Sequence, residues 1–257
     1  MVMEKILPYL VEKPWGGEFL GQHFRSNLKK IGEAWLLSTL PEGESQIDGG
    51  PLSHYLGGPL PYLIKILDTQ EPLSVQVHPN DEWATKLENS KGKTECWLIL
   101  NTTPGAGVYL GLNEGVDEEA LAKALRENTA VEKVMKFHPV KRGDFISVPA
   151  GTIHAIGAGV TLLEVQQASG ITYRLWDWNR PAREMHIEKG LKVANFQASH
   201  GVLFNIFDGQ GPRPLLSHKD FSCAFGQSSG EGWFVDLETL GVRRGKHAGP
   251  GQFVFVK

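Results

Sequence analysis

Short strand-like segments recur along this chain, and their spacing limits the folds that it can adopt. They are apolar or alternate between apolar and polar residues, and 30 glycines and 15 prolines spread through the 257 residues supply turns between them. The chain is therefore predicted to be mainly β, as a barrel or a double sheet rather than an alternating α/β fold. The segments are Ala34–Leu40, Tyr62–Leu67, Leu73–His78, Glu95–Leu100, Gly143–Pro149, Val160–Gln167 and Gln252–Val256.

One stretch between two groups of strands has the features of an α-helix. Residues Asp117–Glu127 begin with a candidate N-cap and an acidic first turn, and Leu121 and Leu125 lie four residues apart on one face. The chain is thus predicted to carry a helical insertion. Further helical pieces are expected at Val131–Phe137, Asp81–Glu88 and Glu188–Val193.

Composition excludes several classes of function. A formal net charge of −3, with no long run of like charge, gives no reason to expect a nucleic acid or an anionic membrane as partner. No apolar run has the length of a membrane span, and Pro8 and Glu12 interrupt the apolar N-terminal patch, unlike a signal peptide. Cys96 and Cys223 are too few for a disulfide framework. We expect a soluble cytoplasmic protein with reduced cysteines.

Leu73–His78 is unusual because its polar face carries Ser74, Gln76 and His78 rather than charges. Alternation in a strand points Gln76 and His78 the same way, at a separation that suits two ligands of one metal ion. An ordinary polar outer face is the alternative. Glu95 opens a strongly apolar strand, where a carboxylate either lies at the solvated end or has a cationic partner.

A third segment, Gly143–His154, fits the pattern G-x5-P-x-G-x2-H without a gap. Gly143 is expected to turn the chain into a buried strand, and Pro149 and Gly151 then turn it tightly, so that His154 points back into a barrel. A buried histidine bonded to a carbonyl group is the alternative. After Gln-x-His and an isolated glutamate, the histidine is better explained as the last metal ligand.

The pattern resembles the second motif of the cupins, which are small metal-binding β-barrels. The surrounding sequence is similar to the short bacterial and archaeal branch of the type I mannose-6-phosphate isomerases. Matching pieces occur in the order of that family and together cover roughly residues 10 to 195, so the likeness rests on no single short motif. They are Lys13–Gly17, Gly32–Ser38, Leu73–Asp81, Gly92–Trp97, Pro149–Gly157 and Thr172–Arg180.

The resemblance implies a cupin-type double-stranded β-helix, also called a jelly-roll barrel, with the helical insertion around residues 114–137. Residues 1–199 would form the metal-binding catalytic region. Residues 200–257 would form a shortened C-terminal β region packed on the N-terminal strands, because the chain beyond this point matches the family poorly.

The resemblance also implies a function, the interconversion of mannose 6-phosphate and fructose 6-phosphate through an enediol. In that family one divalent metal, usually zinc, is held by residues that fall here on Gln76, His78, Glu95 and His154. Zinc accepts such a mixed set of nitrogen and oxygen ligands, and iron, manganese, cobalt or nickel would also fit. Lys93 stands where the family has a lysine of the catalytic machinery, and a solvated loop lysine is the alternative.

Three more residues are candidates for catalysis or substrate binding. Arg174 lies in an apolar run and needs a partner, either a sugar phosphate or enediolate oxygen, or a structural ion pair with Asp177 or Glu164. Glu164 stands at the spacing of a family site glutamate, as a proton-transfer group or as the partner that orients Arg174. Ser74 is a candidate phosphate or hydroxyl contact beside Lys93 and Arg174, the predicted phosphate-binding cations.

The chain departs from the family at two positions near the site. Gly170 stands where many relatives have an aspartate, and Gly92 precedes the lysine where longer members have a histidine. Gly170 favours an alternative function, in which the protein is a catalytically reduced cupin that binds metal and senses sugar phosphates. Retention of Lys93, Glu164 and Arg174 favours the isomerase. A metal oxygenase is disfavoured because such cupins usually have histidine in place of the glutamine. The predicted partner is a small-molecule sugar phosphate, and the predicted state is a monomer or weak homodimer.

Overall fold

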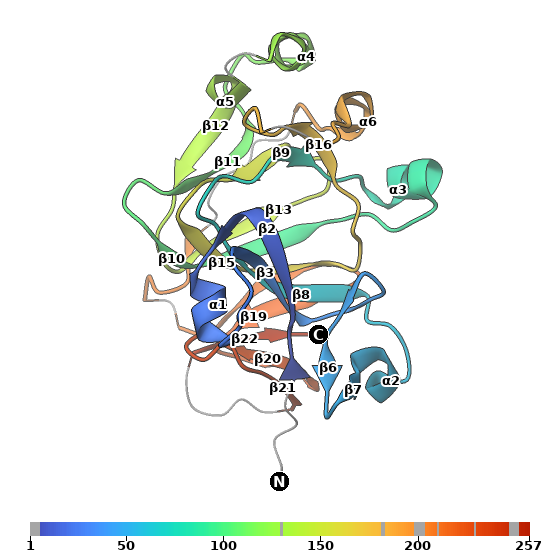
Figure 1. Ribbon diagram of the computed structural model, residues 1–257, viewed down its shortest axis with the longest axis vertical. Helices are drawn as coiled ribbons and strands as arrows, with labels where there is room; N and C mark the ends of the chain where they lie inside the picture. The colour runs from blue at the N-terminus through green and yellow to red at the C-terminus, as the bar shows by residue number, and fades with distance from the viewer. Residues whose placement is uncertain are drawn as a thin grey trace.

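The structure, a computed structural model, describes residues 6–128, 131–180, 183–197, 204–209, 211–228, 230–246 and 252–257. Within these residues the protein is mainly β, as predicted, and its three large sheets are antiparallel. From top to bottom in Figure 1 the layers are helices, a five-stranded sheet, a seven-stranded sheet and a C-terminal five-stranded sheet.

The seven-stranded sheet forms the middle of this stack, with the strand order β17-β13-β10-β15-β8-β3-β2. Every residue of β8 and β15 is buried, because other layers cover both faces of the sheet. This explains why apolar residues occupy both faces of these two strands. In chain order the strands are β2 (Tyr9–Gly17), β3 (Ile31–Leu37), β8 (Tyr62–Asp68), β10 (Glu95–Thr102), β13 (Asp144–Val148), β15 (Val160–Gln167) and β17 (Phe204–Asn205).

The five-stranded sheet above it has the order β12-β11-β14-β9-β16. Its strand β9, between β14 and β16, is shorter than the predicted strand Leu73–His78, since it pairs with β16 only from Val75 to Val77. The backbone N–H of Leu73 still donates a hydrogen bond to the carbonyl oxygen of Ile156, at 2.8 Å. The strands are β9 (Val75–Val77), β11 (Gly107–Leu112), β12 (Met135–Pro139), β14 (His154–Ile156) and β16 (Tyr173–Trp176).

The C-terminal sheet packs below the seven-stranded sheet, in the order β18-β19-β22-β20-β21. Two small sheets, β1-β6-β7 and β4-β5, complete the fold. The C-terminal strands are β18 (Arg213–Ser217), β19 (Ser222–Phe225), β20 (Gly232–Asp236), β21 (Val242–Gly245) and β22 (Phe253–Val256). The small strands are β1 (Ile6–Leu7), β4 (Thr39–Leu40), β5 (Gly43–Glu44), β6 (Gln46–Ile47) and β7 (Gly50–Pro51).

Helices α4, α5 and α6 lie above the five-stranded sheet, whereas α1, α2 and α3 lie at the sides of the molecule (Figure 1). The predicted helix forms as α4, capped by the Asp117 carboxylate, which accepts a hydrogen bond from the backbone N–H of Ala120. The predicted helical turn Val131–Phe137 is wrong beyond Val134, because Met135–Pro139 pairs with β11 as a strand. In the described part of the chain no helix is both long and apolar enough to cross a membrane. The helices are α1 (Phe19–His23), α2 (Leu52–Leu56), α3 (Asp81–Glu88), α4 (Glu118–Glu127), α5 (Val131–Val134) and α6 (Ile187–Val193).

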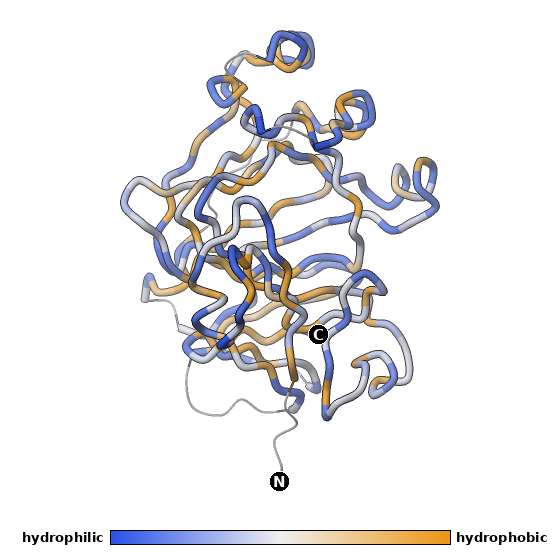
Figure 2. Tube along the Cα trace, in the orientation of Figure 1, coloured by the Kyte–Doolittle hydropathy of each residue, from blue (hydrophilic) through white to orange (hydrophobic). Residues whose placement is uncertain are grey.

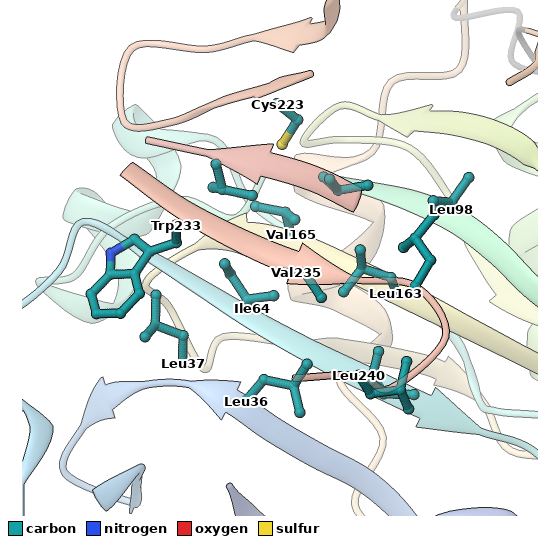
Figure 3. Packing of buried hydrophobic residues seen from close by; sticks show 14 of the residues in the cluster. Leu36, Leu37, Ile64, Leu98, Leu163, Val165, Cys223, Trp233, Val235 and Leu240 are labelled. Carbon is teal, nitrogen blue, oxygen red and sulfur yellow. The ribbon is translucent and has the colours of Figure 1, made fainter. Parts of the chain in front are cut away.

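Strand alternation divides the interior into three apolar layers. On β15, Leu162 points toward the five-stranded sheet, whereas Leu163 and Val165 point toward the C-terminal sheet. Figure 2 shows the hydrophobic positions concentrated along the strands, while the helices carry both kinds of residue. In Figure 3, Trp233 and Val235 of the C-terminal sheet lie among residues of the seven-stranded sheet, which places the two sheets around one shared core.

The division at residues 199 and 200 stays a prediction. The first strand described beyond it, β17, pairs with β13 and so belongs to the seven-stranded sheet.

Because the two sheets share a core, Trp233→Ala is expected to destabilise the whole protein and not only its C-terminal part. Trp233 is 3% exposed, and truncation of such a side chain costs about 3–5 kcal/mol of unfolding free energy. Urea unfolding followed by far-UV circular dichroism and tryptophan fluorescence should show one shifted transition. Leu28→Ala, at a side chain that is 44% exposed, should cost less than about 0.5 kcal/mol. Two separate transitions would contradict a shared core.

Candidate active site

Four predicted metal ligands converge between the two upper sheets. Gln76 of β9 and His154 of β14 are register partners in the five-stranded sheet. Glu95, the first residue of β10, faces them from the seven-stranded sheet, with its carboxylate oxygens 3.4 Å from His78 Nε2 and 3.4 Å from His154 Nε2. Ligand atoms of the two histidines and the glutamate lie within 4.8 Å of one another. This group can hold a metal ion.

Both histidines are oriented by backbone carbonyl groups. His78 Nδ1 lies 3.0 Å from the Ile171 oxygen, and His154 Nδ1 lies 2.9 Å from the Thr152 oxygen. Donation from Nδ1–H leaves each Nε2 with a lone pair directed at the centre of the site. Burial lowers the pKa of His78 well below its ordinary value, and the charge of Lys93 lowers it further. The imidazole is therefore neutral, which is the form that binds a metal.

Gln76 and Glu95 supply the remaining ligand atoms. The Gln76 side-chain amide lies 3.2 Å from His154 Nε2, and rotation of the amide by half a turn exchanges its nitrogen for its oxygen. Glu95 Oε2 is buried and lies 2.9 Å from the ammonium nitrogen of Lys93. A buried carboxylate oxygen in these surroundings is suited to a cation. The donor set thus fits a divalent ion.

A row of six charged side chains of alternating sign runs from this group across the seven-stranded sheet. Successive members lie 2.9 to 4.0 Å apart by nitrogen–oxygen distance. The row begins on β2 with a lysine whose side chain is 29% exposed and ends at Glu95, a buried predicted metal ligand. We call it the charge row, and its members are Lys13, Glu33, Lys65, Glu164, Lys93 and Glu95.

The charge row shifts the pKa values of its buried members. Burial alone would lower the pKa of Lys65, but the carboxylates of Glu164 and Glu33 more than offset this and raise it. Burial would raise the pKa of Glu33, but Lys65 and Lys13 lower it to about 2. Burial raises the pKa of Glu164, and the nearby Glu95 charge raises it further against the opposing lysines. Glu164 thus holds a proton more readily than an ordinary glutamate does.

Tryptophans fix two parts of the charge row. The indole N–H of Trp97 lies 3.1 Å from an oxygen of Glu95 and 3.1 Å from an oxygen of Glu164, so it bridges the two carboxylates. Trp35 donates to Glu33 at 2.7 Å. Both indoles therefore pack against the site and also orient its carboxylates.

Arg174 lies beside the site, and neither ion pair considered from the sequence is formed. It is the register partner of Gln76, so both belong to the same face of the sheet. Asp177 is instead paired with Arg180 and Arg183, and Glu164 with Lys65. Arg174 Nη1 donates to the Glu184 carbonyl oxygen at 2.8 Å, and its buried Nε has no partner among the described residues.

Ser74, a candidate substrate contact, is buried, and its hydroxyl oxygen lies 3.5 Å from Gln76 Oε1.

The two glycines that depart from the family pattern, Gly92 and Gly170, have different surroundings. A Cβ atom at Gly92 would lie 2.6 Å from backbone atoms of Asn80 and Asp81, so the chain is too close there for any side chain. At Gly170 a Cβ atom would lie 2.8 Å from Glu42 Oε1, the end of a flexible side chain. A carboxylate from another loop therefore stands beside Gly170.

Sequence reasoning missed Lys65, Glu33 and Lys13. A signal for Lys65 was present, since a lysine interrupts the apolar run of β8, Tyr-Leu-Ile-Lys-Ile-Leu. Glu33 similarly interrupts Ile-Gly-Glu-Ala-Trp-Leu-Leu in β3. A buried charge in such a strand needs a partner, but the sequence does not say which one.

The chain has detectable relatives among known proteins. The family model described as phosphomannose isomerase type I, catalytic domain, matches residues 8–96. Mannose-6-phosphate isomerase ManA of Bacillus subtilis (strain 168) is 36% identical over 209 residues, which cover 72% of this chain and 66% of ManA. YvyI of the same strain, named for the same activity, is 32% identical over 222 residues, which cover 77% of this chain and 70% of YvyI. The chain thus spans about two thirds of the length of these relatives.

Solved structures share the fold. The crystal structure of the mannose 6-phosphate isomerase from Bacillus subtilis has a TM-score of 0.80 at 23% identity, over 100% of this chain and 99% of that one. A mannose 6-phosphate isomerase bound with zinc and yttrium has a TM-score of 0.71 at 15% identity, over 100% and 99%. At these identities the likeness concerns the fold alone.

The depressed pKa of Glu33 predicts a loss of stability in acid. Its ion pairs contribute stability that is complete above its ordinary pKa of 4.5 and is lost as the pH falls toward about 2. At 1.36 kcal/mol per pKa unit, this shift corresponds to roughly 3 kcal/mol. Glu33→Gln should remove this pH-dependent part, so its unfolding free energy should depend less on pH in this range.

Urea unfolding of both proteins between about pH 7 and pH 2 would measure the difference. Glu82→Gln is the matched control, since Glu82 pairs with Lys86 on the surface, with its side chain 67% exposed. Parallel curves for Glu33→Gln and the wild type would show that Glu33 is not held charged by its lysines.

Proposed function

Because the chain belongs to the family of type I mannose-6-phosphate isomerases, we propose that it interconverts mannose 6-phosphate and fructose 6-phosphate. The observation that best supports this activity is the position of Lys93. Its ammonium nitrogen lies 2.9 Å from Glu95 Oε2, 3.1 Å from His78 Nε2 and 4.0 Å from Glu164 Oε1. A lysine and a glutamate available for proton transfer thus adjoin the candidate metal ligands in a buried site.

The reaction moves one proton between C2 and C1 of the open-chain sugar and another between O2 and O1, so that the carbonyl group shifts from C1 to C2. It passes through an enediol, so one group must accept the proton and return it while another stabilises the developing oxyanion. We assign proton transfer to Glu164 and Lys93. The raised pKa of Glu164 suits a carboxyl group that alternates between its protonated and ionised forms. Lys65, 3.0 Å from Glu164 Oε1, would hold that carboxylate in place.

We propose one divalent ion, zinc, held by the four residues predicted as ligands: Gln76, His78, Glu95 and His154. When bound, it would act as a Lewis acid toward the sugar oxygen on which negative charge develops. The neutral imidazole of His78 and the close approach of the ligand atoms of His78, Glu95 and His154 support this assignment.

Charge balance supports a phosphorylated substrate. The three lysines of the charge row balance its three glutamates, so a divalent ion would leave two positive charges uncompensated. A sugar phosphate brings about two negative charges at neutral pH. Arg174, Lys93 and Ser74 are the proposed phosphate contacts, and Arg174 has a buried N–H without a described partner.

The alternative function is a metal-binding sugar-phosphate sensor that has lost turnover. Gly170 favours it, since no carboxylate is attached at that position. The continuous charge row favours the enzyme, because a binding protein does not require a buried lysine between two buried glutamates. A cytoplasmic location, the division at residues 199 and 200, and a monomeric or weakly dimeric state remain predictions.

Purified protein is expected to convert mannose 6-phosphate to fructose 6-phosphate in a metal-dependent manner. Chelation should abolish turnover and zinc should restore it, because the oxyanion would lose its electrophile. A coupled assay for fructose 6-phosphate measures turnover, and elemental analysis measures bound metal. About one equivalent of metal without turnover on any aldose phosphate would favour the sensor.

Lys93→Gln is expected to lower kcat by about 10²- to 10⁴-fold, the range for loss of a proton-transfer group. Bound metal should remain at the wild-type level, since the four ligands are kept. The matched control is Lys91→Gln, at an exposed position two residues away in the same loop. A kcat for Lys93→Gln equal to that of Lys91→Gln would mean that Lys93 is a loop lysine without a catalytic role.

A further inference from the structure

The loop that carries Lys93 is held on both sides by two side chains that belong to other elements. The backbone N–H of Gly92 donates to Asp81 Oδ1 at 2.9 Å, and that of Thr94 donates to Gln167 Oε1 at 2.8 Å. Asp81 begins α3, and Gln167 ends β15. These two acceptors therefore bracket Lys93 and determine where its backbone lies.

The acceptors are themselves held by the C-terminal sheet. The turn between β18 and β19 places Lys219 Nζ 2.6 Å from Asp81 Oδ2 and Asp220 Oδ2 2.7 Å from Gln167 Nε2. Gln167 Nε2 also lies 3.3 Å from Asp81 Oδ1, which joins the two acceptors. A continuous set of polar contacts thus runs from the C-terminal turn to the two amides that flank Lys93.

The side chains that make these contacts differ in burial. This difference determines how strongly the loss of each one affects the loop and the stability of the fold. Gln167 is 1% exposed, whereas the Asp220 side chain is 20% exposed, so loss of Asp220 removes the shorter of the two carboxylate contacts of Gln167 and leaves its contact with Asp81. The Lys219 side chain is 61% exposed, and such a surface ion pair contributes little to global stability. The contacts therefore act on the position of the loop more than on the stability of the fold.

We propose that Asp220 and Lys219 are positioning residues for Lys93, so that the C-terminal sheet takes part in catalysis without touching the substrate. The inference rests on the proposed function, in which Lys93 transfers protons. Small displacements of a catalytic group cost activity steeply. The turn thus makes the geometry of the site depend on the docking of the C-terminal sheet.

Asp220→Ala in the full-length, metal-loaded protein tests this proposal. The expected result is a kcat lowered by about 3- to 30-fold with KM within about twofold of the wild type. Bound metal and the unfolding midpoint should stay at wild-type values. Asp220→Asn keeps an acceptor oxygen for Gln167, and it should restore kcat to within about twofold. Lys219→Ala should give a smaller loss of kcat, which Lys219→Arg restores.

Glu231→Ala is the matched control, because Glu231 pairs with Arg244 in the same sheet, with both side chains well exposed. It should leave kcat unchanged. Equal kcat values for Asp220→Ala, Glu231→Ala and the wild type would overturn the proposal, as would a lower midpoint that accounts for the loss.

Amide hydrogen exchange measured by NMR separates this inference from the proposed function. In Asp220→Ala the N–H groups of Gly92 and Thr94 should exchange at least about threefold faster, while amides of the central strands keep their rates. Amide exchange can be measured whether or not the protein has isomerase activity. An inactive wild type would refute the isomerase, and unchanged exchange at Gly92 and Thr94 would refute the positioning role.

Discussion

Buried carboxylates need positive partners, and in this protein that requirement organises the space between two sheets. Glu95 and Glu164 lie in the interior and share the indole N–H of Trp97. Two like charges this close are tolerated only with cations at hand. Lys93 and Lys65 supply them, and Lys65 brings in Glu33 as a further carboxylate. The charge row therefore continues until it reaches solvent at Lys13, and removing one member leaves its neighbour uncompensated.

The two faces of the seven-stranded sheet have different roles. One face carries residues of the candidate site, and the other packs against the C-terminal sheet. On β10, Glu95 and Trp97 lie on the face directed at His78 and His154, while Cys96 and Leu98 face the C-terminal sheet. The sulfur atoms of Cys96 and Cys223 lie 4.0 Å apart across that interface. The C-terminal layer thus packs directly behind the strand that carries a predicted ligand. Its docking also places the turn whose contacts reach the loop of Lys93.

The likeness to solved isomerases shows that core packing restricts an amino-acid sequence less than the geometry of a ligand set does. The layers superimpose over the whole chain at only 23% identity. Apolar layers accept many substitutions if volume and pattern are kept. A set of metal ligands does not accept many substitutions, because each ligand must present a particular atom in a particular direction. Three of the six segments that carried the resemblance surround Gln76, Glu95 and His154, whereas the C-terminal region matched poorly by sequence and nevertheless forms a five-stranded layer.

The sequence by itself determined what depends on local geometry. Strand alternation put Gln76 and His78 on one side of the chain, glycine and proline placed the turn before His154, and the cap of α4 followed from Asp117. The helix predicted at Val131–Phe137 was wrong from Met135 onward, because the pairing of Met135–Pro139 with β11 is not visible locally. Only the tertiary structure decided the partners of Lys65 and Glu33, and the contact of Asp220 with Gln167. These pairs join strands and turns far apart in sequence, and a buried charge shows that it needs a partner without showing which strand lies beside it.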